Sequence, residues 1–295
     1  MLHGTVPFTK LHGLGNDYLY VNCFDYQRDM NWGKLAREMA DRHFGPGSDG
    51  LILVLPSEIA DFRMRMFNSD GSEGDMCGNG MRCFAKYVYE RGLTEKMSFT
   101  VETRAGIVES HLTVDNGIVT RVCVDMGVPL FGRSETPLAR LDGPEPVMNL
   151  EVTLGDETFL GTPLFLGNPH CVFFTHNLAE IDLERIGPGL ERHPLFPRKA
   201  NIEFVEVKSR WEIDMRVWER GSGITLACGT GACASVVAAV LHGFADRGAV
   251  VTVNLPGGAL EVIWRQDGHV WQMGPAVEVY RGIYFLNSVP VRKGT

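Results

Sequence analysis

The 295-residue chain contains an internal repeat, which constrains its fold more than any other feature of the sequence. The segment Met64–Asn68 corresponds to Met215–Glu219, 151 positions later, and the same offset places Cys77–Gly80 on Cys228–Gly231 without a gap. Two unrelated glycine turns would not share one register over such a length. Self-similarity at a fixed offset indicates a duplicated structural unit. The sequence therefore predicts two copies of one domain.

The repeat also sets the predicted domain boundaries. We expect a first domain over residues 1–128, a second over 150–274, and a linker over 129–149, which holds four prolines and no hydrophobic period. The C-terminal segment 275–295 is expected to return to the first domain. A chain of this length favours two domains, at roughly 150 residues for each.

The hydrophobic pattern predicts more strands than helices. Alternation and short apolar runs predict strands over 51–55, 61–67, 98–103, 106–114 and 118–125, and again between 249 and 273. In each copy a buried helix follows the glycine turn, from Met81 to a C-cap at Gly92 and over Ala232–Leu241. Surface helices are expected near Trp32–Asp41 and Asp182–Arg192.

These elements predict an α+β fold of two pseudo-symmetric domains. Each domain is expected to be a mostly antiparallel sheet or barrel wrapped around one central helix. The active site is expected in the cleft between the two domains, where the repeated cysteine motifs would face each other.

Composition excludes several classes of protein. The net charge of −8 argues against nucleic-acid and anionic-membrane partners, which clustered Lys and Arg residues bind. Seven scattered cysteines do not make a disulfide scaffold, so a reducing compartment is the simpler interpretation. The longest apolar stretch is far below the roughly 18 residues of a membrane span, and residues 1–10 lack a secretory pattern. We therefore expect a cytoplasmic protein.

Each copy places a cysteine, Cys77 or Cys228, directly before the glycine-rich start of a helix. Free N–H groups and the positive end of the helix dipole favour anions there, so each thiol is biased toward thiolate. The glycines would let a ligand carboxylate approach the backbone amides. Cys83 and Cys233 lie inside the helices and are expected to be small buried apolar residues.

Cysteines in this pattern could have three other uses. The spacing of Cys77 from Cys83, and of Cys228 from Cys233, does not fit the close pairs of a zinc site, so no metal is expected. A Cys–His hydrolase needs one activated cysteine and leaves the second copy unexplained. A disulfide between Cys77 and Cys228 stays open geometrically, although a cytoplasmic location argues against a constitutive one.

Two-base proton transfer uses both cysteines. One thiolate would remove a proton from a carbon while the opposite thiol delivers another to the other face, so the stereochemistry inverts. The two helix starts would stabilise the carbanion-like transition state through its carboxylate. No cofactor is then required, and the sequence has no evident pyridoxal-lysine or nucleotide motif.

Several separate motifs follow one another along the chain, namely Phe67–Glu73, Cys77–Cys83, Gly167–His170, Asn201–Val205, Glu219–Gly221 and Ala227–Ala232. In this order they resemble the diaminopimelate epimerase family of cofactor-independent amino-acid racemases. The resemblance extends from about Phe8 to about Leu286, nearly the whole chain.

The resemblance implies an isomerase that interconverts LL- and meso-2,6-diaminopimelate in lysine and peptidoglycan precursor synthesis, without a cofactor. Its partner would be this small molecule, and homodimers are common in the family. By similarity, Cys77 would take the proton from the LL isomer and Cys228 from the meso isomer. The reacting carboxylate would lie against the residue pairs Gly78–Asn79 and Gly229–Thr230.

Further site residues follow from the same resemblance. Glu219 and His170 match residues near the thiols that tune their pKa or hold their geometry, and Glu219 also belongs to the substrate site. Arg220 offers a bidentate fork for a second carboxylate, and a single-headed substrate would leave it idle. The other residues that would hold polar groups of the substrate are Asn16, Asn68, Asn168 and Asn201.

Two positions depart from the family pattern. Gly50 stands where some members carry a substrate-binding glutamine, and Ile224 stands where a glutamate is often found.

Two alternative functions stay open. One is a racemase or epimerase of histidine, proline or hydroxyproline, although proline-type enzymes usually have Cys-Gly-His-Gly. The other is a catalytically silent binding or isomerase relative, although such relatives typically lack one or both cysteines.

Overall fold

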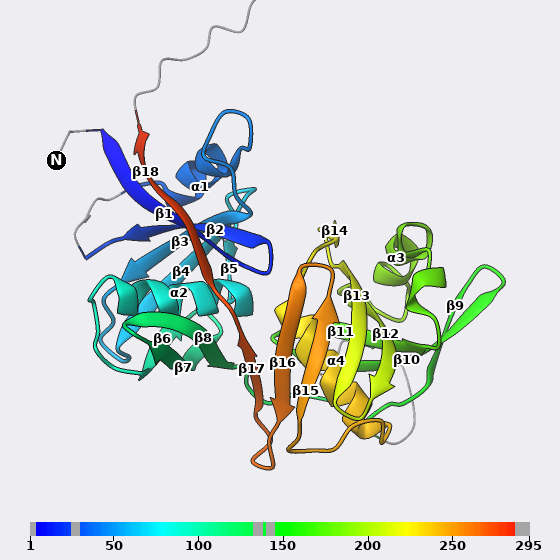
Figure 1. Cartoon of the computed structure of the whole chain (residues 1–295). Coiled ribbons are helices and arrows are strands. Elements are labelled where there is room, and N and C mark those ends of the chain that lie inside the picture. The colour runs from blue at the N-terminus through cyan, green and yellow to red at the C-terminus, as the bar shows by residue number, and fades with distance from the viewer. Residues whose placement is uncertain (1–3, 25–29, 132–137, 140–144, 287–295) are drawn as a thin grey trace, which may run out of the picture.

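A computed structural model describes residues 4–24, 30–131, 138–139 and 145–286 of the chain. In these residues strands greatly outnumber helices, which confirms the α+β class (Figure 1). The helices are α1 (Trp32–Ala40), α2 (Gly78–Glu90), α3 (Leu183–Glu191) and α4 (Gly229–Leu241), with a short 3-10 helix, η1 (Leu178–Glu180).

The strands form two groups. Those of the first group are β1 (Thr5–Gly13), β2 (Asn16–Asn22), β3 (Gly50–Leu55), β4 (Phe62–Asn68), β5 (Glu73–Gly74), β6 (Ser98–Thr103), β7 (Gly106–Asp115) and β8 (Ile118–Asp125). Those of the second group are β9 (Leu150–Leu154), β10 (Glu157–Leu166), β11 (Asn168–Thr175), β12 (Asn201–Ser209), β13 (Glu212–Glu219), β14 (Gly223–Ile224), β15 (Val250–Leu255), β16 (Gly258–Trp264) and β17 (Val270–Gly274). The last strand is β18 (Val277–Phe285).

Strand pairing follows the same order in both groups. β2 pairs with β3 in parallel, β3 with β4 antiparallel, β4 with β6 in parallel, and β6 with β7 and β7 with β8 antiparallel. The second group repeats this series strand for strand, from β11 through β12, β13, β15 and β16 to β17. The 151-residue repeat in the sequence thus corresponds to a repeated, mostly antiparallel topology.

Two pairings connect the groups. β8 pairs with β17, so the last strand of each series joins the other in one continuous ladder. β18 then leaves β17 and pairs along β1 (Figure 1). In the stretch expected as a linker, Leu130 pairs with Phe165, and residues 132–137 and 140–144 lie outside the described residues. The predicted domain boundaries stay predictions.

The central helices α2 and α4 begin three residues earlier than expected. Cys77 and Cys228 are their N-caps, so the Gly-x-Gly segments form the first helical turn rather than a turn before the helix. Both helices end where the sequence predicts a stop, because Gly92 and the equivalent Gly243 adopt positive φ.

The surface helices occur where the sequence places them. Asn31 caps α1 and Asp182 caps α3, each through a side chain that accepts a hydrogen bond from a first-turn amide. α1 packs on a core cluster that includes Leu19 and Leu51, and α3 on one that includes Ile202. Each group of strands therefore lies between a surface helix and a central helix.

Candidate active site

The two repeated cysteines occupy equivalent positions at the starts of α2 and α4. The Cys77 sulfur accepts a hydrogen bond from the Gly80 amide at 3.4 Å, and the Cys228 sulfur accepts one from the Gly231 amide at 3.3 Å. Both cysteines have extended backbone, as N-caps do. Capping therefore fixes each sulfur beside the free amides of a buried helix.

The two thiols have different neighbours. Cys77 is half-buried, and its thiol donates to Asn16 Oδ1 at 3.4 Å. Asn16 is itself oriented by Asp49, whose Oδ2 accepts from Asn16 Nδ2 at 2.8 Å. The Tyr18 hydroxyl is also within hydrogen-bonding reach of this thiol. The surroundings of Cys77 are thus polar, and its direct contacts are uncharged.

Cys228 is buried beside acidic groups. Its sulfur lies 3.6 Å from Thr230 Oγ1, and its thiol hydrogen-bonds to Glu219. Glu219 Oε1 also accepts from the Thr225 hydroxyl at 2.5 Å. A second carboxylate, that of Glu203, contributes to the electrostatic environment of the thiol.

A buried His–Glu pair stands behind Cys228. His170 Nδ1 and Glu203 Oε1 are 2.7 Å apart, and both side chains are fully shielded from solvent. An ionised carboxylate only accepts, so Nδ1 is the donating nitrogen of this pair. Gly231 is required beside this pair, because a Cβ there would lie 2.8 Å from Glu203 Oε1 and 3.1 Å from the Cys228 sulfur.

Burial raises the pKa of both thiols. For Cys77 burial outweighs the lowering by the Gly80 amide and the Tyr18 hydroxyl. For Cys228 the pKa is raised much further, because burial acts together with the charges of Glu219 and Glu203. The sequence pattern predicts a bias toward thiolate, and the net upward direction of both pKa values opposes that bias. The helix-start amides are present, but desolvation of the thiolate costs more than they return.

Three buried polar atoms of the site have no hydrogen-bond partner within the described residues. They are Asn168 Oδ1, His170 Nε2 and Glu203 Oε2. Buried polar atoms are nearly always paired, so unpaired ones gathered in one place need an explanation. An ammonium or another donor of a bound molecule could satisfy Asn168.

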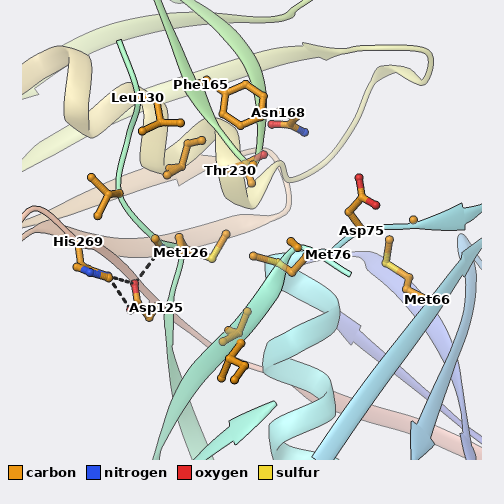
Figure 2. A pocket seen from close by; sticks show the side chains of 18 of the residues that line it. Met66, Asp75, Met76, Asp125, Met126, Leu130, Phe165, Asn168, Thr230 and His269 are labelled. Atoms are coloured by element: carbon orange, nitrogen blue, oxygen red, sulfur yellow. Dashed lines mark hydrogen bonds and ion pairs between the residues drawn. The ribbon is translucent and has the colours of Figure 1, made fainter. Parts of the chain in front are cut away.

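A cavity of about 490 Å³ lies between the two groups of strands (Figure 2). Asn168, Arg220 and Thr230 line it from the second group, and residues around Met76 line it from the first. The sulfurs of Cys77 and Cys228 do not line this cavity, although Met76 and Thr230 lie close to them in the chain. The cavity therefore adjoins the thiols and is large enough for an amino acid.

Asn201 and Asn68 have mainly structural contacts. The Asn201 side chain accepts from the Arg220 amide at 2.8 Å and donates to the Pro169 carbonyl at 3.0 Å, so it fixes the backbone that carries the arginine. Asn68 donates to the Ser72 hydroxyl at 3.0 Å in a turn. Within the described residues the Asn68 side chain forms no hydrogen bond with either thiol.

All seven cysteines lie in the described part of the chain, and each is a free thiol. Across residues 4–24, 30–131, 138–139 and 145–286, no cluster of His, Cys, Asp or Glu has the arrangement of a metal site. No helix of these ranges combines the length and apolarity that crossing a membrane requires.

Known proteins match the chain over nearly its whole length. The family model for diaminopimelate epimerase matches residues 8–131 and 164–279. The chain belongs to the diaminopimelate epimerase family. Curated diaminopimelate epimerases that it resembles come from Heliobacterium modesticaldum, at 50% identity over 94% of this chain and 99% of the relative, and from Acetivibrio thermocellus, at 51% identity over 96% and 99%.

Solved structures share the fold. A hydroxyproline epimerase from Agrobacterium vitis, with bound trans-4-hydroxy-L-proline, superposes with a TM-score of 0.71 at 14% identity, covering 97% of this chain and 94% of that one. A PhzF-family phenazine biosynthesis protein from Bacillus anthracis gives a TM-score of 0.70 at 21% identity, covering 95% and 99%. Identities this low bear on the fold alone.

The two departures from the family pattern have different surroundings. Gly50 is buried, and a Cβ there would lie 2.1 Å from the Phe67 carbonyl oxygen, so a larger residue requires a shift of the β3–β4 ladder. Ile224 is 42% exposed and pairs with Trp218 in the short ladder of β13 and β14. The structure gives no reason to assign Ile224 a role in the site.

Sequence reasoning missed several residues of this site. Glu203 lies within one of the family motifs. The sequence of a single strand, however, does not show that this side chain is buried beside His170 on the neighbouring strand. Tyr18 follows the predicted Asn16 by two positions and therefore shares its face of β2. Arg82, which donates to Asn79 Oδ1, lies inside the first cysteine motif. Gln272, which donates to the Gly229 carbonyl, lies in no motif that the sequence shows.

Replacing Glu219 with glutamine is expected to lower the pKa of Cys228, because the carboxylate charge disfavours the thiolate. Burial raises the pKa of Glu219 above its unfolded value, so its ionised form costs stability as pH rises through that range. Glu219→Gln should therefore fold at least as stably as wild type at neutral pH. Ultraviolet thiolate titration in a Cys77→Ser background measures the shift.

Glu206→Gln is the matched control for this titration, because Glu206 lies in the same sheet but bonds to Lys208 and the Leu178 amide. The pKa values of other buried thiols are also raised, to about 11 for Cys23 and about 12 for Cys83, so the shift of Cys228 is taken as the difference between the titration curves with and without Glu219→Gln in the same background. An unchanged or higher pKa of Cys228 in Glu219→Gln contradicts the electrostatic role.

Proposed function

We propose that the protein interconverts LL- and meso-2,6-diaminopimelate by two-base proton transfer at one α-carbon. Membership of the diaminopimelate epimerase family supports the substrate. The observation that carries the chemistry is the equivalent placement of Cys77 and Cys228 as N-caps of two pseudo-symmetric buried helices. With one base on each face, one residue can remove the proton and the other can return a proton from the opposite side, which inverts the stereocentre.

In the proposed reaction one cysteine begins as thiolate and the other as thiol. The thiolate removes the α-proton and becomes a thiol, and the opposite thiol donates its proton to the other face and becomes the thiolate. By family resemblance Cys77 is the base toward the LL isomer and Cys228 the base toward the meso isomer. The carboxylates of Glu219 and Glu203 raise the pKa of Cys228, which supports Cys77 as the cysteine that ionises first.

The helix starts bind the reacting carboxylate in this proposal. The amides of Gly78, Asn79, Gly229 and Thr230 belong to first helical turns, whose N–H groups have no partner inside the helix. They stabilise the negative charge that moves onto the carboxylate as the α-proton leaves. Removing one such donor typically costs about 3 kcal/mol of transition-state stabilisation.

The rest of the substrate occupies the adjoining cavity. Arg220 supplies a fixed cation for the remote carboxylate, and the unpaired Asn168 Oδ1 can accept from an ammonium. Asn16 holds Cys77, Asn201 holds the Arg220 backbone, and His170 with Glu219 tunes Cys228. A substrate-binding role for Asn68 rests on the family resemblance alone.

The proposal extends to the cellular setting. We infer that the enzyme acts in lysine and peptidoglycan precursor synthesis, as a cytoplasmic homodimer without pyridoxal phosphate or another cofactor. Seven free thiols suit a reducing compartment, which supports the cytoplasmic location. Ultracentrifugation of the purified protein measures the assembly.

Incubation of LL-diaminopimelate with reduced protein in deuterated water tests the proposal. We expect solvent deuterium at one α-carbon of the meso product, because the proton that arrives comes from a solvent-exchanged thiol. Mass spectrometry measures the label and chiral chromatography the product. Histidine, proline and hydroxyproline, offered in parallel, should neither exchange nor invert. Absence of exchange into LL-diaminopimelate overturns the assignment.

A further inference from the structure

Arg82 is a fully buried cation without a carboxylate partner. It lies on α2 five residues after Cys77 and is among the largest side chains of the protein with no exposed surface. Its guanidinium forms no ion pair with any described carboxylate. By contrast Lys86, one turn further along α2, is neutralised by Glu90 at 2.6 Å. Of the two buried cations on α2, Lys86 therefore has a carboxylate partner and Arg82 has none among the described residues.

The partners of Arg82 are neutral oxygens. Nη2 donates to Asn79 Oδ1 at 2.8 Å, Nη1 donates to Gln272 Oε1, and Nε donates to the Pro275 carbonyl at 3.2 Å. Because these oxygens face a guanidinium, the two side-chain amides are oriented with their NH₂ groups pointing away from it. The orientation of Asn79 and Gln272 is thus set by Arg82.

The two oriented amides reach the start of the opposite helix. Asn79 Nδ2 donates to the Ala227 carbonyl at 3.2 Å, and Gln272 Nε2 donates to the Gly229 carbonyl at 2.7 Å. The contact is close, because a Cβ at position 229 would lie 2.9 Å from Gln272 Nε2. A chain of hydrogen bonds therefore runs from α2 through Arg82 to the first turn of α4.

A lone buried cation is costly. The effective penalty is several kcal/mol for an ion taken out of water, and neutral amides compensate only part of it. An anion between the two helix starts would complete the compensation. Arg82 favours such an anion electrostatically, since its charge lowers the pKa of Cys77, which lies at one of these starts. The structure thus has a positive charge where the proposed reaction places a thiolate and a carboxylate.

We propose that Arg82 is a positioning residue that ties the first turns of α2 and α4 together and supplies the fixed positive charge for the anions bound between them. It acts through Asn79 and Gln272 and does not touch the substrate. This inference rests on the proposed function for its substrate carboxylate, but its effect on the Cys77 thiolate is independent of any substrate.

Alkylation of Cys77 by iodoacetamide, followed by peptide mass spectrometry over a pH series, tests the charge. Arg82→Met and Arg82→Gln should raise the pH midpoint of Cys77 alkylation by about one unit, whereas Arg82→Lys keeps the charge and the midpoint. All three should lower kcat for epimerisation at least tenfold, because none retains a fork that orients both amides. Circular dichroism establishes that each variant is folded.

Lys86→Met is the matched control, since it removes a buried cation from the same helix but away from the thiols. It should lower thermal stability and leave the Cys77 midpoint and kcat unchanged. A folded neutral Arg82 variant with the wild-type midpoint overturns the electrostatic role. If neither neutral variant folds, Arg82→Lys tests the positioning role. A wild-type kcat in that variant overturns this role, and a tenfold loss of kcat supports it.

The two proposals fail in different ways. Wild-type protein that does not exchange deuterium into LL-diaminopimelate overturns the proposed function. The alkylation midpoints need no substrate, so a shift in the neutral Arg82 variants of that same protein would still support the electrostatic role.

Discussion

Cys77→Ala and Cys228→Ala should each reduce epimerisation by at least roughly 10²–10⁴-fold, the contribution usual for a positioned acid or base. Each cysteine serves one face of the α-carbon, so the remaining thiol cannot complete an inversion alone. Steady-state assays from the LL and the meso isomer, each followed by chiral chromatography, measure the loss. Both directions should fail in both variants, because every turnover uses the two residues once.

Cys83→Ala and Cys233→Ala are the matched controls for these variants. Both thiols lie inside the same two helices, with at most 1% of their surface exposed, and belong to the central core cluster. Their removal should cost stability of about 1 kcal/mol and leave turnover near wild type. Full activity in either Cys77→Ala or Cys228→Ala would falsify the two-base mechanism.

The repeat made much of the fold predictable. The constant offset of 151 residues between the two copies predicted equivalent elements. The strand pairings do repeat, from β2 to β8 and from β11 to β17. The helix ends followed from glycines that adopt positive φ. The pairing of β8 with β17 was beyond prediction, because hydrophobic alternation identifies the buried face of a strand but not its neighbour.

The site was predictable where local sequence sets its geometry. An N-cap position follows from a few adjacent residues, so the repeated Cys-Gly-x-Gly pattern placed both sulfurs at helix starts. The Glu203–His170 pair and Gln272 depend on strands meeting across the sheet, which one sequence does not reveal. The thiol pKa values are raised by burial and lowered by the helix-start amides. Local sequence does not show which of these two effects is larger.

Arg220→Met should lower kcat/KM for diaminopimelate by about 10- to 100-fold, mainly through KM. Hydrogen bonds to a charged group contribute about 1.5–3 kcal/mol, which is a factor of that size in affinity. Arg220 lines the cavity, and within the described residues its guanidinium donates to the Arg198 carbonyl at 3.3 Å and pairs with no carboxylate. It is therefore free to pair with the remote carboxylate of the substrate.

Two comparison variants separate this role from a structural one. Arg220→Lys keeps the charge but loses the planar fork, so it should recover only part of kcat/KM. Arg198→Met changes an exposed neighbour that does not line the cavity, and should behave as wild type. The Arg220 amide is held by Asn201 at 2.8 Å through the backbone, so Arg220→Met should fold normally. An unchanged KM in folded Arg220→Met would place the second carboxylate elsewhere and reopen the question of a single-headed substrate.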